Sequence, residues 1–177
     1  KEVIETTISI GDYSSAYVVG TDEENGYVYI AIEPDGMGGY ILFSGDMWVS
    51  RIDISDWSYM QMFSSGYMTD ISIEHQKMVV RDSVSSTLMI SIIDLETWEK
   101  NSYSIDSQYG QAGNAYLSPD GTKVAYAVAV GDPSDEYGAV YLIDMEENTH
   151  VEYAPHARGV YKVSGWADNN TINYTLR

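Results

Sequence analysis

The most informative stretch of this sequence is Tyr116-Leu117-Ser118-Pro119-Asp120-Gly121-Thr122-Lys123-Val124-Ala125-Tyr126. It places a Pro-Asp-Gly turn between two short runs of mainly apolar residues. Proline presets the backbone angle φ for the turn, and aspartate and glycine tolerate the conformations that follow. The stretch therefore predicts two antiparallel strands joined by a tight turn.

The strand after this turn is apolar on both faces, because Val124, Tyr126 and Val128 alternate with three alanines. Both faces of such a strand must be covered, which favours stacked sheets over a sheet with one wet face. Similar runs occur at 27–32 and 78–80, and no window shows the apolar periodicity of an amphipathic helix. The sequence predicts an all-β protein.

A second element recurs along the chain, and its copies are 41 and 50 residues apart. Each copy ends an apolar run, precedes a polar turn, and follows a strand, a tight turn and another strand. Recurrence at this period predicts four-stranded units, as in the blades of a β-propeller. The copies are Ile52-Asp53-Ile54, Ile93-Asp94-Leu95 and Ile143-Asp144-Met145, and the preceding turns lie at 33–36, 74–77 and 118–121, with a fourth at 166–170.

About four antiparallel blades are expected to make the 177 residues a single β-propeller domain. Residues 3–10 and 15–20 are expected to supply the third and fourth strands of the last blade, so that the two chain ends pair and close the ring. The alternative is part of a larger propeller, such as a half-ring that a second copy completes as a homodimer. The predicted units span about 27–63, 69–105, 113–154 and 161–177, the last completed by 1–20.

The third unit resembles a known repeat. Residues 116–126, followed by Val140-Tyr141-Leu142-Ile143-Asp144, are similar to the WD-repeat-like repeat of TolB-type propellers, which also builds the N-terminal propellers of prolyl-oligopeptidase-type enzymes. The resemblance is weaker at 69–105, where Glu-His-Gln replaces Pro-Asp-Gly. It implies a rigid disc that presents loops, that is often exported from bacteria, and that commonly binds a protein or another ligand.

Composition excludes several functions. The formal charge of −18 argues against nucleic-acid binding and against docking on an anionic membrane. Without cysteine there is no disulfide, thiolate zinc site or cysteine nucleophile. No Gly-x-Ser-x-Gly or phosphate-binding Gly-rich motif is present, and apolar runs are too short to span a bilayer. We therefore expect no enzyme activity, no cofactor and no membrane insertion.

Metal binding is not favoured by the spacing of candidate ligands. The three histidines, His75, His150 and His156, are expected on the surface, because their separation does not enforce convergence. Acidic loops at 22–25 and 132–136 have oxygen ligands of the kind that bind calcium, but neither has an EF-hand pattern. Solvated loop charge is the simpler interpretation of both.

One loop face is the candidate binding surface. In a propeller, the loops that join successive blades share a face with the loops between the second and third strands of each blade. Tyrosines beside carboxylate, amide and guanidinium groups on such a face suit recognition of a carbohydrate or a protein. The residues expected there are Asp22, Glu23, Tyr67, Tyr109, Gln111, Asp135, Tyr137, His156 and Arg158.

The sequence thus predicts a non-enzymatic binding module for a protein or glycan, extracellular or periplasmic in a bacterium. Two alternatives remain. The chain is part of a larger ring, such as the N-terminal propeller of a peptidase-type enzyme, or it is a metal-dependent, lactonase-like propeller enzyme with carboxylates converging on the central axis.

Overall fold

A computed structural model describes residues 13–34, 48–63, 66–84, 86–130 and 137–177. The chain divides into two compact units, Lys1–Ser65 and Gly66–Arg177. None of the described residues belongs to a helix that could cross a membrane. The regular elements are β1 (Tyr13–Asp22), β2 (Tyr27–Pro34), β3 (Trp48–Asp53), β4 (Tyr59–Phe63), β5 (Tyr67–Ser72), β6 (Lys77–Val84), β7 (Thr87–Asp94), β8 (Lys100–Ser104), β9 (Gln111–Leu117), β10 (Lys123–Ala129), β11 (Tyr137–Asp144), β12 (Thr149–Arg158), β13 (Tyr161–Asp168) and β14 (Thr171–Leu176).

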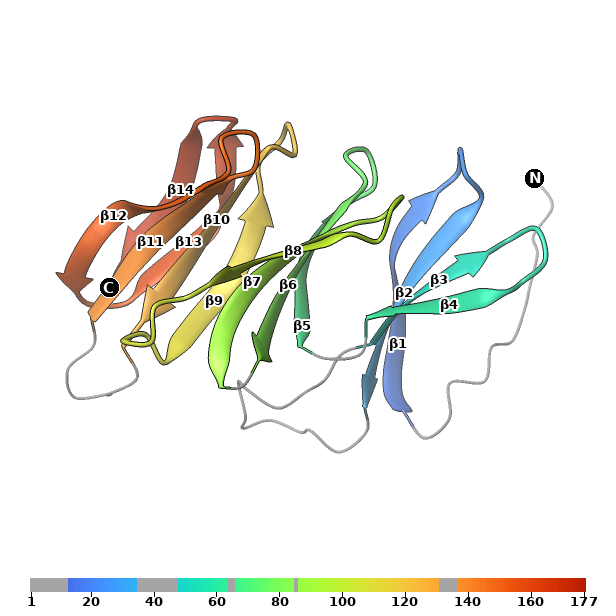
Figure 1. Cartoon of the computed structure of the whole chain (residues 1–177), viewed down its shortest axis with the longest axis horizontal. Coiled ribbons are helices and arrows are strands. Elements are labelled where there is room, and N and C mark those ends of the chain that lie inside the picture. Colours follow the sequence, from blue (N-terminus) through green and yellow to red (C-terminus); the bar gives the residue numbers. More distant parts are fainter. Residues whose placement is uncertain (1–12, 35–47, 64–65, 85, 131–136) are drawn as a thin grey trace. The chain divides into compact units, whose positions relative to one another are not determined.

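Three four-stranded antiparallel sheets confirm the predicted blade architecture (Figure 1). The first unit contains blade 1, with strand order β1-β2-β3-β4. The second unit contains blade 2 (β5-β6-β7-β8), blade 3 (β9-β10-β11-β12) and a two-stranded sheet, the β13–β14 hairpin. Blades 2 and 3 and the hairpin follow the predicted units at 69–105, 113–154 and 161–177 closely.

Blade 1 differs from the prediction by one strand. Residues 15–20 were expected in the last blade, but they lie in β1, which pairs with β2 from Tyr13↔Pro34 to Asp22↔Tyr27. The physical reason is the Asn25-Gly26 pair between these strands, since Gly26 has φ of 72° and Asn-Gly favours a tight hairpin. The predicted strand at 3–10 lies outside the described residues. The β13–β14 hairpin therefore gains no strand from 13–22.

The recurring Ile-Asp element ends the third strand of each blade and caps the turn that follows. The side chain of Asp94 accepts hydrogen bonds from the backbone N–H groups of Glu96 and Thr97 at 3.0 and 2.7 Å. The next residue, Leu95, donates its N–H to the carbonyl of Gln76 in the β5–β6 turn at 2.8 Å. Equivalent bonds occur in the other two blades: the N–H of Ile54 donates to the carbonyl of Gly26, and the N–H of Met145 donates to the carbonyl of Thr122. The Ile-Asp repeat thus stabilises the turns of each blade.

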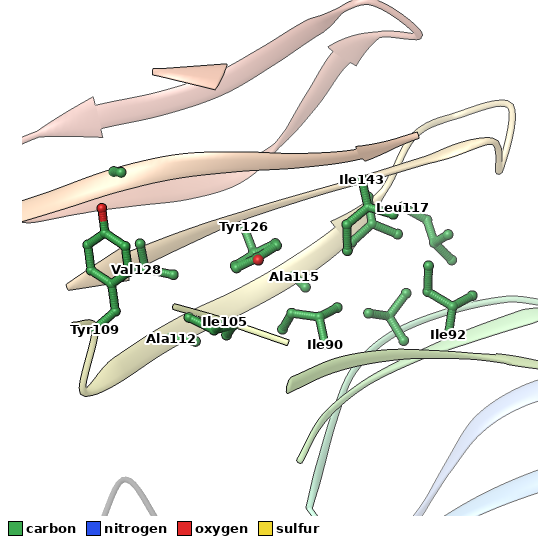
Figure 2. Packing of buried hydrophobic residues seen from close by; sticks show 13 residues of the cluster. Ile90, Ile92, Ile105, Tyr109, Ala112, Ala115, Leu117, Tyr126, Val128 and Ile143 are labelled. Carbon is green, nitrogen blue, oxygen red and sulfur yellow. The ribbon is translucent and has the colours of Figure 1, made fainter. Parts of the chain in front are cut away.

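Blade 3 is buried on both faces, as its alternating apolar residues require. Val124, Tyr126 and Val128 pack with Ile90 and other residues of blade 2 in one core cluster (Figure 2). Ala125 and Ala127 belong to a second cluster with residues of the β13–β14 hairpin, namely Tyr161, Val163 and Ile172. The small alanines allow the hairpin to approach, while the larger residues fill the space towards blade 2.

Candidate functional site

Four of the predicted site residues gather where blade 3 ends, and we call this group the aromatic end of blade 3: Tyr109, Tyr137, His156 and Arg158. Tyr137 begins β11 and is in register with Arg158 at the end of β12. The rings of Tyr137 and His156 have centroids 5.0 Å apart, and those of Tyr109 and His156 are 6.1 Å apart. His156 therefore lies against two tyrosines from different segments.

Exposure divides these four residues into two layers. His156 and Arg158 are exposed and Tyr137 is partly exposed, so they can reach a ligand. Tyr109 was expected in an exposed loop but is buried, with only 3% of its surface accessible. Its ring packs edge-on against Tyr141 at 6.0 Å, and burial raises the pKa of its hydroxyl. Tyr109 thus supports the surface layer from beneath.

The aromatic contacts continue from this end into the space between blades 2 and 3. Tyr141 on β11 stacks on Tyr126 of β10, with ring centroids 5.8 Å apart. The Tyr126 hydroxyl lies 2.6 Å from Nε2 of His150, and the ring of Tyr103 on β8 meets His150 edge-on. Because the imidazole is partly buried, the pKa of His150 is lowered. The expectation of a surface position is wrong for this histidine.

Tyr141 belongs to this site but is not among the residues predicted for it from the sequence. Tyr137, Ala139 and Tyr141 alternate along β11, and side chains two residues apart share one face of a strand. That spacing was the available signal that Tyr141 would extend the surface formed by Tyr137.

Two further candidates on the second unit, Gln111 and Tyr67, lie on β9 and β5. Gln111 is exposed at the start of β9. Tyr67 on β5 has the guanidinium carbon of Arg81 5.6 Å from its ring centroid, and Arg81 also donates a hydrogen bond to the carbonyl of Ala112. Arg81 thus contacts the ring of Tyr67 within blade 2 and links this blade to β9. Asp135 falls outside the described residues.

Asp22 ends β1 and Glu23 begins the β1–β2 turn of blade 1, so their expected place among the blade-joining loops is wrong. The cause is again the hairpin, which puts them at the end of the blade opposite to the β2–β3 connection. Asp22 is buried, and its carboxylate accepts hydrogen bonds from the backbone N–H and the side-chain amide of Asn25 at 3.0 and 2.9 Å. It stabilises the turn, while Glu23 is exposed.

The described residues contain no group of three or more histidine, aspartate or glutamate side chains that could hold a metal ion. What the aromatic end of blade 3 offers is flat ring surface, an imidazole and a guanidinium. These groups suit stacking and hydrogen bonding to a ligand. The acidic segment 132–136 lies outside the described residues.

Comparison with known proteins places the fold among β-propellers. No protein-family model matches the sequence, and no curated protein matches it either. Similar solved structures include an oligogalacturonate lyase from Vibrio parahaemolyticus, with 12% identity and a TM-score of 0.62 over 88% of this chain. The β-propeller domain of the Trilobed protease from Pyrococcus furiosus gives 12% and 0.54 over 84%. A TolB-like protein from Agrobacterium tumefaciens gives 16% and 0.53 over 85%.

The matched share of these proteins is smaller than the matched share of this chain. The chain spans 43% of the lyase, 45% of the protease propeller and 52% of the TolB-like protein. At these identities the likeness concerns the fold alone. The chain is thus similar to about half of each of these propeller proteins.

Proposed function

We propose that this chain is a non-enzymatic propeller-type binding module that recognises a protein or a glycan through the aromatic end of blade 3. The observation that carries the proposal is the contact of His156 with both Tyr137 and Tyr109, at ring-centroid distances of 5.0 and 6.1 Å. Rings that are already packed lose little conformational freedom when a ligand binds, which favours affinity. Exposed Arg158 adds a planar set of hydrogen-bond donors beside them.

The same proposal includes an extracellular or periplasmic location in a bacterium. The resemblance of residues 116–126 to TolB-type repeats supports it, as does the fold similarity to a TolB-like protein. The formal charge of −18 fits a soluble module that repels its own copies and prefers neutral or basic partners.

The binding proposal is tested with labelled chain applied to a glycan array and, separately, used to select from a peptide phage library. Ligands found with the wild type are then measured with Tyr137→Ala and His156→Ala. Tyr153→Ala is the matched control, because Tyr153 is a 43% exposed tyrosine of β12 outside the aromatic end. We expect at least about tenfold weaker binding for the first two variants and none of this loss for the control. Equal binding by all variants, or no ligand from either source, contradicts the proposal.

A second candidate function, assembly into a larger propeller, is favoured by a different observation. The β13–β14 sheet has two strands, whereas each blade has four, and the chain spans less than half of the lyase and protease propellers. Light scattering tests it. A dimer of the 19.7 kDa chain supports a shared ring, and a monomer at micromolar concentration contradicts the homodimer. The measurement is repeated with calcium, since a calcium-dependent change would support the metal-dependent alternative.

A further inference from the structure

The β13–β14 hairpin has an unpaired strand edge. β14 pairs with β13 in a two-stranded sheet, whereas each blade continues to a third and a fourth strand. Arg177 and Val160 exchange two backbone hydrogen bonds, at 2.9 and 3.1 Å, so the residues that alternate with Arg177 point their N–H and C=O groups away from β13. Leu176 and Tyr174 therefore offer main-chain donors and acceptors along an edge that no described strand covers.

Exposed apolar side chains lie beside this edge. Ile172, Tyr174 and Leu176 share one face of β14, and Ile172 is buried against blade 3. The ring of Tyr174 meets that of Tyr153 on β12 edge-on, with centroids 6.3 Å apart. Val151 of β12 faces the same core cluster, because its register partner on β11 packs against that cluster. The side chains left between 41% and 47% exposed on these two strands are Val151, Tyr153, Tyr174 and Leu176.

A strand added beside β14 would cover this apolar surface. β13 packs on β9, β10 and β11, so the next strand beyond β14 would continue over β12. Neighbouring strands within every blade are antiparallel, and we expect the same direction here. Alternate side chains of the added strand would then point at Val151 and Tyr153, and the intervening ones would point at solvent.

The distribution of lysine and arginine indicates which charge the added strand should have. The chain has nine of these residues against 27 acids. Arg158, Lys162 and Arg177 are exposed, and no ion pair joins them to an acid among the described residues. Lys162 is in register with Thr175, and Arg177 follows β14, so two unpaired cations lie at one end of the open edge. The other described bases each contact an acceptor or a ring: Arg51, Lys77, Arg81, Lys100 and Lys123.

We propose that the open edge of β14 binds an extended segment of another protein as a third, antiparallel strand. The segment has apolar residues at alternate positions, which cover Val151 and Tyr153. Acidic residues occupy the intervening positions of its N-terminal half and face Lys162 and Arg177, because an antiparallel strand begins where β14 ends. A second copy of the chain is a less suitable occupant, since it would bring a further charge of −18. This site does not depend on the aromatic end of blade 3.

The test titrates the full chain into a rhodamine-labelled peptide, Glu-Val-Glu-Val-Thr-Val-Thr-Val, and measures fluorescence anisotropy. One control peptide has lysine in place of both glutamates. A second, Thr-Val-Thr-Val-Glu-Val-Glu-Val, moves the carboxylates to the other end of β14.

Variants of the chain test the edge and the cations separately. Leu176→Pro removes an outward N–H without removing a bond to β13, and Leu176→Ala is its matched control for the lost side chain. The double variant Lys162→Gln/Arg177→Gln removes the two cations. Its matched control is Lys123→Gln, because Lys123 lies on β10.

We expect saturable binding of the first peptide and at least about tenfold weaker binding of both control peptides. Leu176→Pro and the double glutamine variant should each bind at least about tenfold more weakly than their matched controls. Tyr153→Ala should also weaken binding of the peptide, whereas Tyr137→Ala should leave it unchanged. A ligand of the aromatic end should show the opposite pattern, so the two proposals fail separately.

Absence of saturable binding, equal binding of the three peptides, or equal binding by Leu176→Pro and Leu176→Ala would overturn the proposal. A dimer of the chain that Leu176→Pro dissociates would overturn it too, because a second copy would then occupy the edge. Thermal unfolding shows whether each variant is folded, and the charge variants decide the question if Leu176→Pro does not fold.

Discussion

Asp70 of blade 2 accepts a hydrogen bond from the backbone N–H of Leu117 in blade 3, at 2.8 Å. The bond joins β5 to β9, which are the first strands of blades 2 and 3. The carboxylate also accepts the N–H of Ile71 at 2.9 Å. Burial raises the pKa of Asp70 despite these bonds. The contact therefore combines a favourable hydrogen bond with an unfavourable buried charge.

Replacing Asp70 separates these two effects. Asp70→Ala removes the acceptor for Leu117 and is expected to lower the free energy of unfolding by about 1–3 kcal/mol. Asp70→Asn retains one acceptor oxygen for Leu117 without the charge, but its NH2 group cannot accept from Ile71 as the second carboxylate oxygen does, so it should be more stable than Asp70→Ala at pH 7. Because the folded-state pKa is raised, the charge penalty is present above that pKa and is relieved as the pH falls towards the ordinary value of 3.8. Urea unfolding at several pH values measures the difference, and an asparagine variant as unstable as alanine would refute the explanation.

His150 is expected to make stability depend on pH near neutrality. Its lowered pKa means that the folded state prefers the neutral imidazole beside the Tyr126 hydroxyl. Its stabilising contribution is therefore complete above the ordinary pKa of 6.5 and is lost progressively as the pH falls below it. The double variant His150→Phe/Tyr126→Phe removes both partners with little change of shape. Its thermal midpoint should vary less than that of the wild type between about pH 7.5 and 5.5. His156→Gln is the control, and an identical pH profile for the double variant would count against this role.

Asp94 is expected to stabilise blade 2 through its turn. Its carboxylate accepts the N–H and the hydroxyl of Thr97 at 2.7 and 2.9 Å, and the hydrogen bond from this N–H is the main cause of its lowered pKa. Asp94→Ala should reduce the free energy of unfolding by about 1 kcal/mol at pH 7. The contribution is present above pH 3.8 and is lost as the pH falls through the lowered pKa. Urea midpoints measure the loss, and Glu96→Ala, which leaves the capping carboxylate in place, is the control.

Gly121 allows the turns of blades 2 and 3 to approach closely. Its φ is 66°, and a Cβ atom there would lie 2.4 Å from Cγ of His75, whose Nε2 is 2.9 Å from the carbonyl oxygen of Pro119. Gly121→Ala should therefore destabilise the chain by about 1–3 kcal/mol. Adding His75→Ala removes the clash but not the backbone strain, so the double variant should recover part of the loss. Thermal unfolding of the single and double variants measures this, and full additivity of the two losses would contradict a clash.

The blades were predictable because their signals are local. Pro119-Asp120-Gly121 forms the expected turn, in which the Ser118 hydroxyl donates to Asp120 at 2.6 Å and holds the pKa of that carboxyl at about 2. The alternation around Tyr126 correctly required cover on both faces. The error in blade 1 was also local, since Asn25-Gly26 was interpreted as part of an acidic loop although it is a strong hairpin signal.

The candidate site was less predictable because it depends on contacts between distant segments. Tyr137 and His156 were predicted in loops, but they lie in β11 and β12, and the pairing of these two strands brings them together. Tyr109 was placed in a loop, which is correct, but loop position does not determine burial. Its cover comes from Tyr141 and His156, and no pattern around residue 109 encodes those contacts.

The hydrogen bond between the two turns at one end of each blade has an evolutionary consequence. Leu95 reaches Gln76, and Met145 reaches Thr122, entirely within one repeat. A duplicated gene segment that encodes one blade would therefore encode the hydrogen bond between its own turns, without the need for a neighbouring blade. The residue four positions after the aspartate differs between the copies, which have Trp57, Trp98 and Asn148 there, although its φ stays between 50° and 69°. Such an arrangement lets new copies acquire new surfaces while inheriting a complete scaffold.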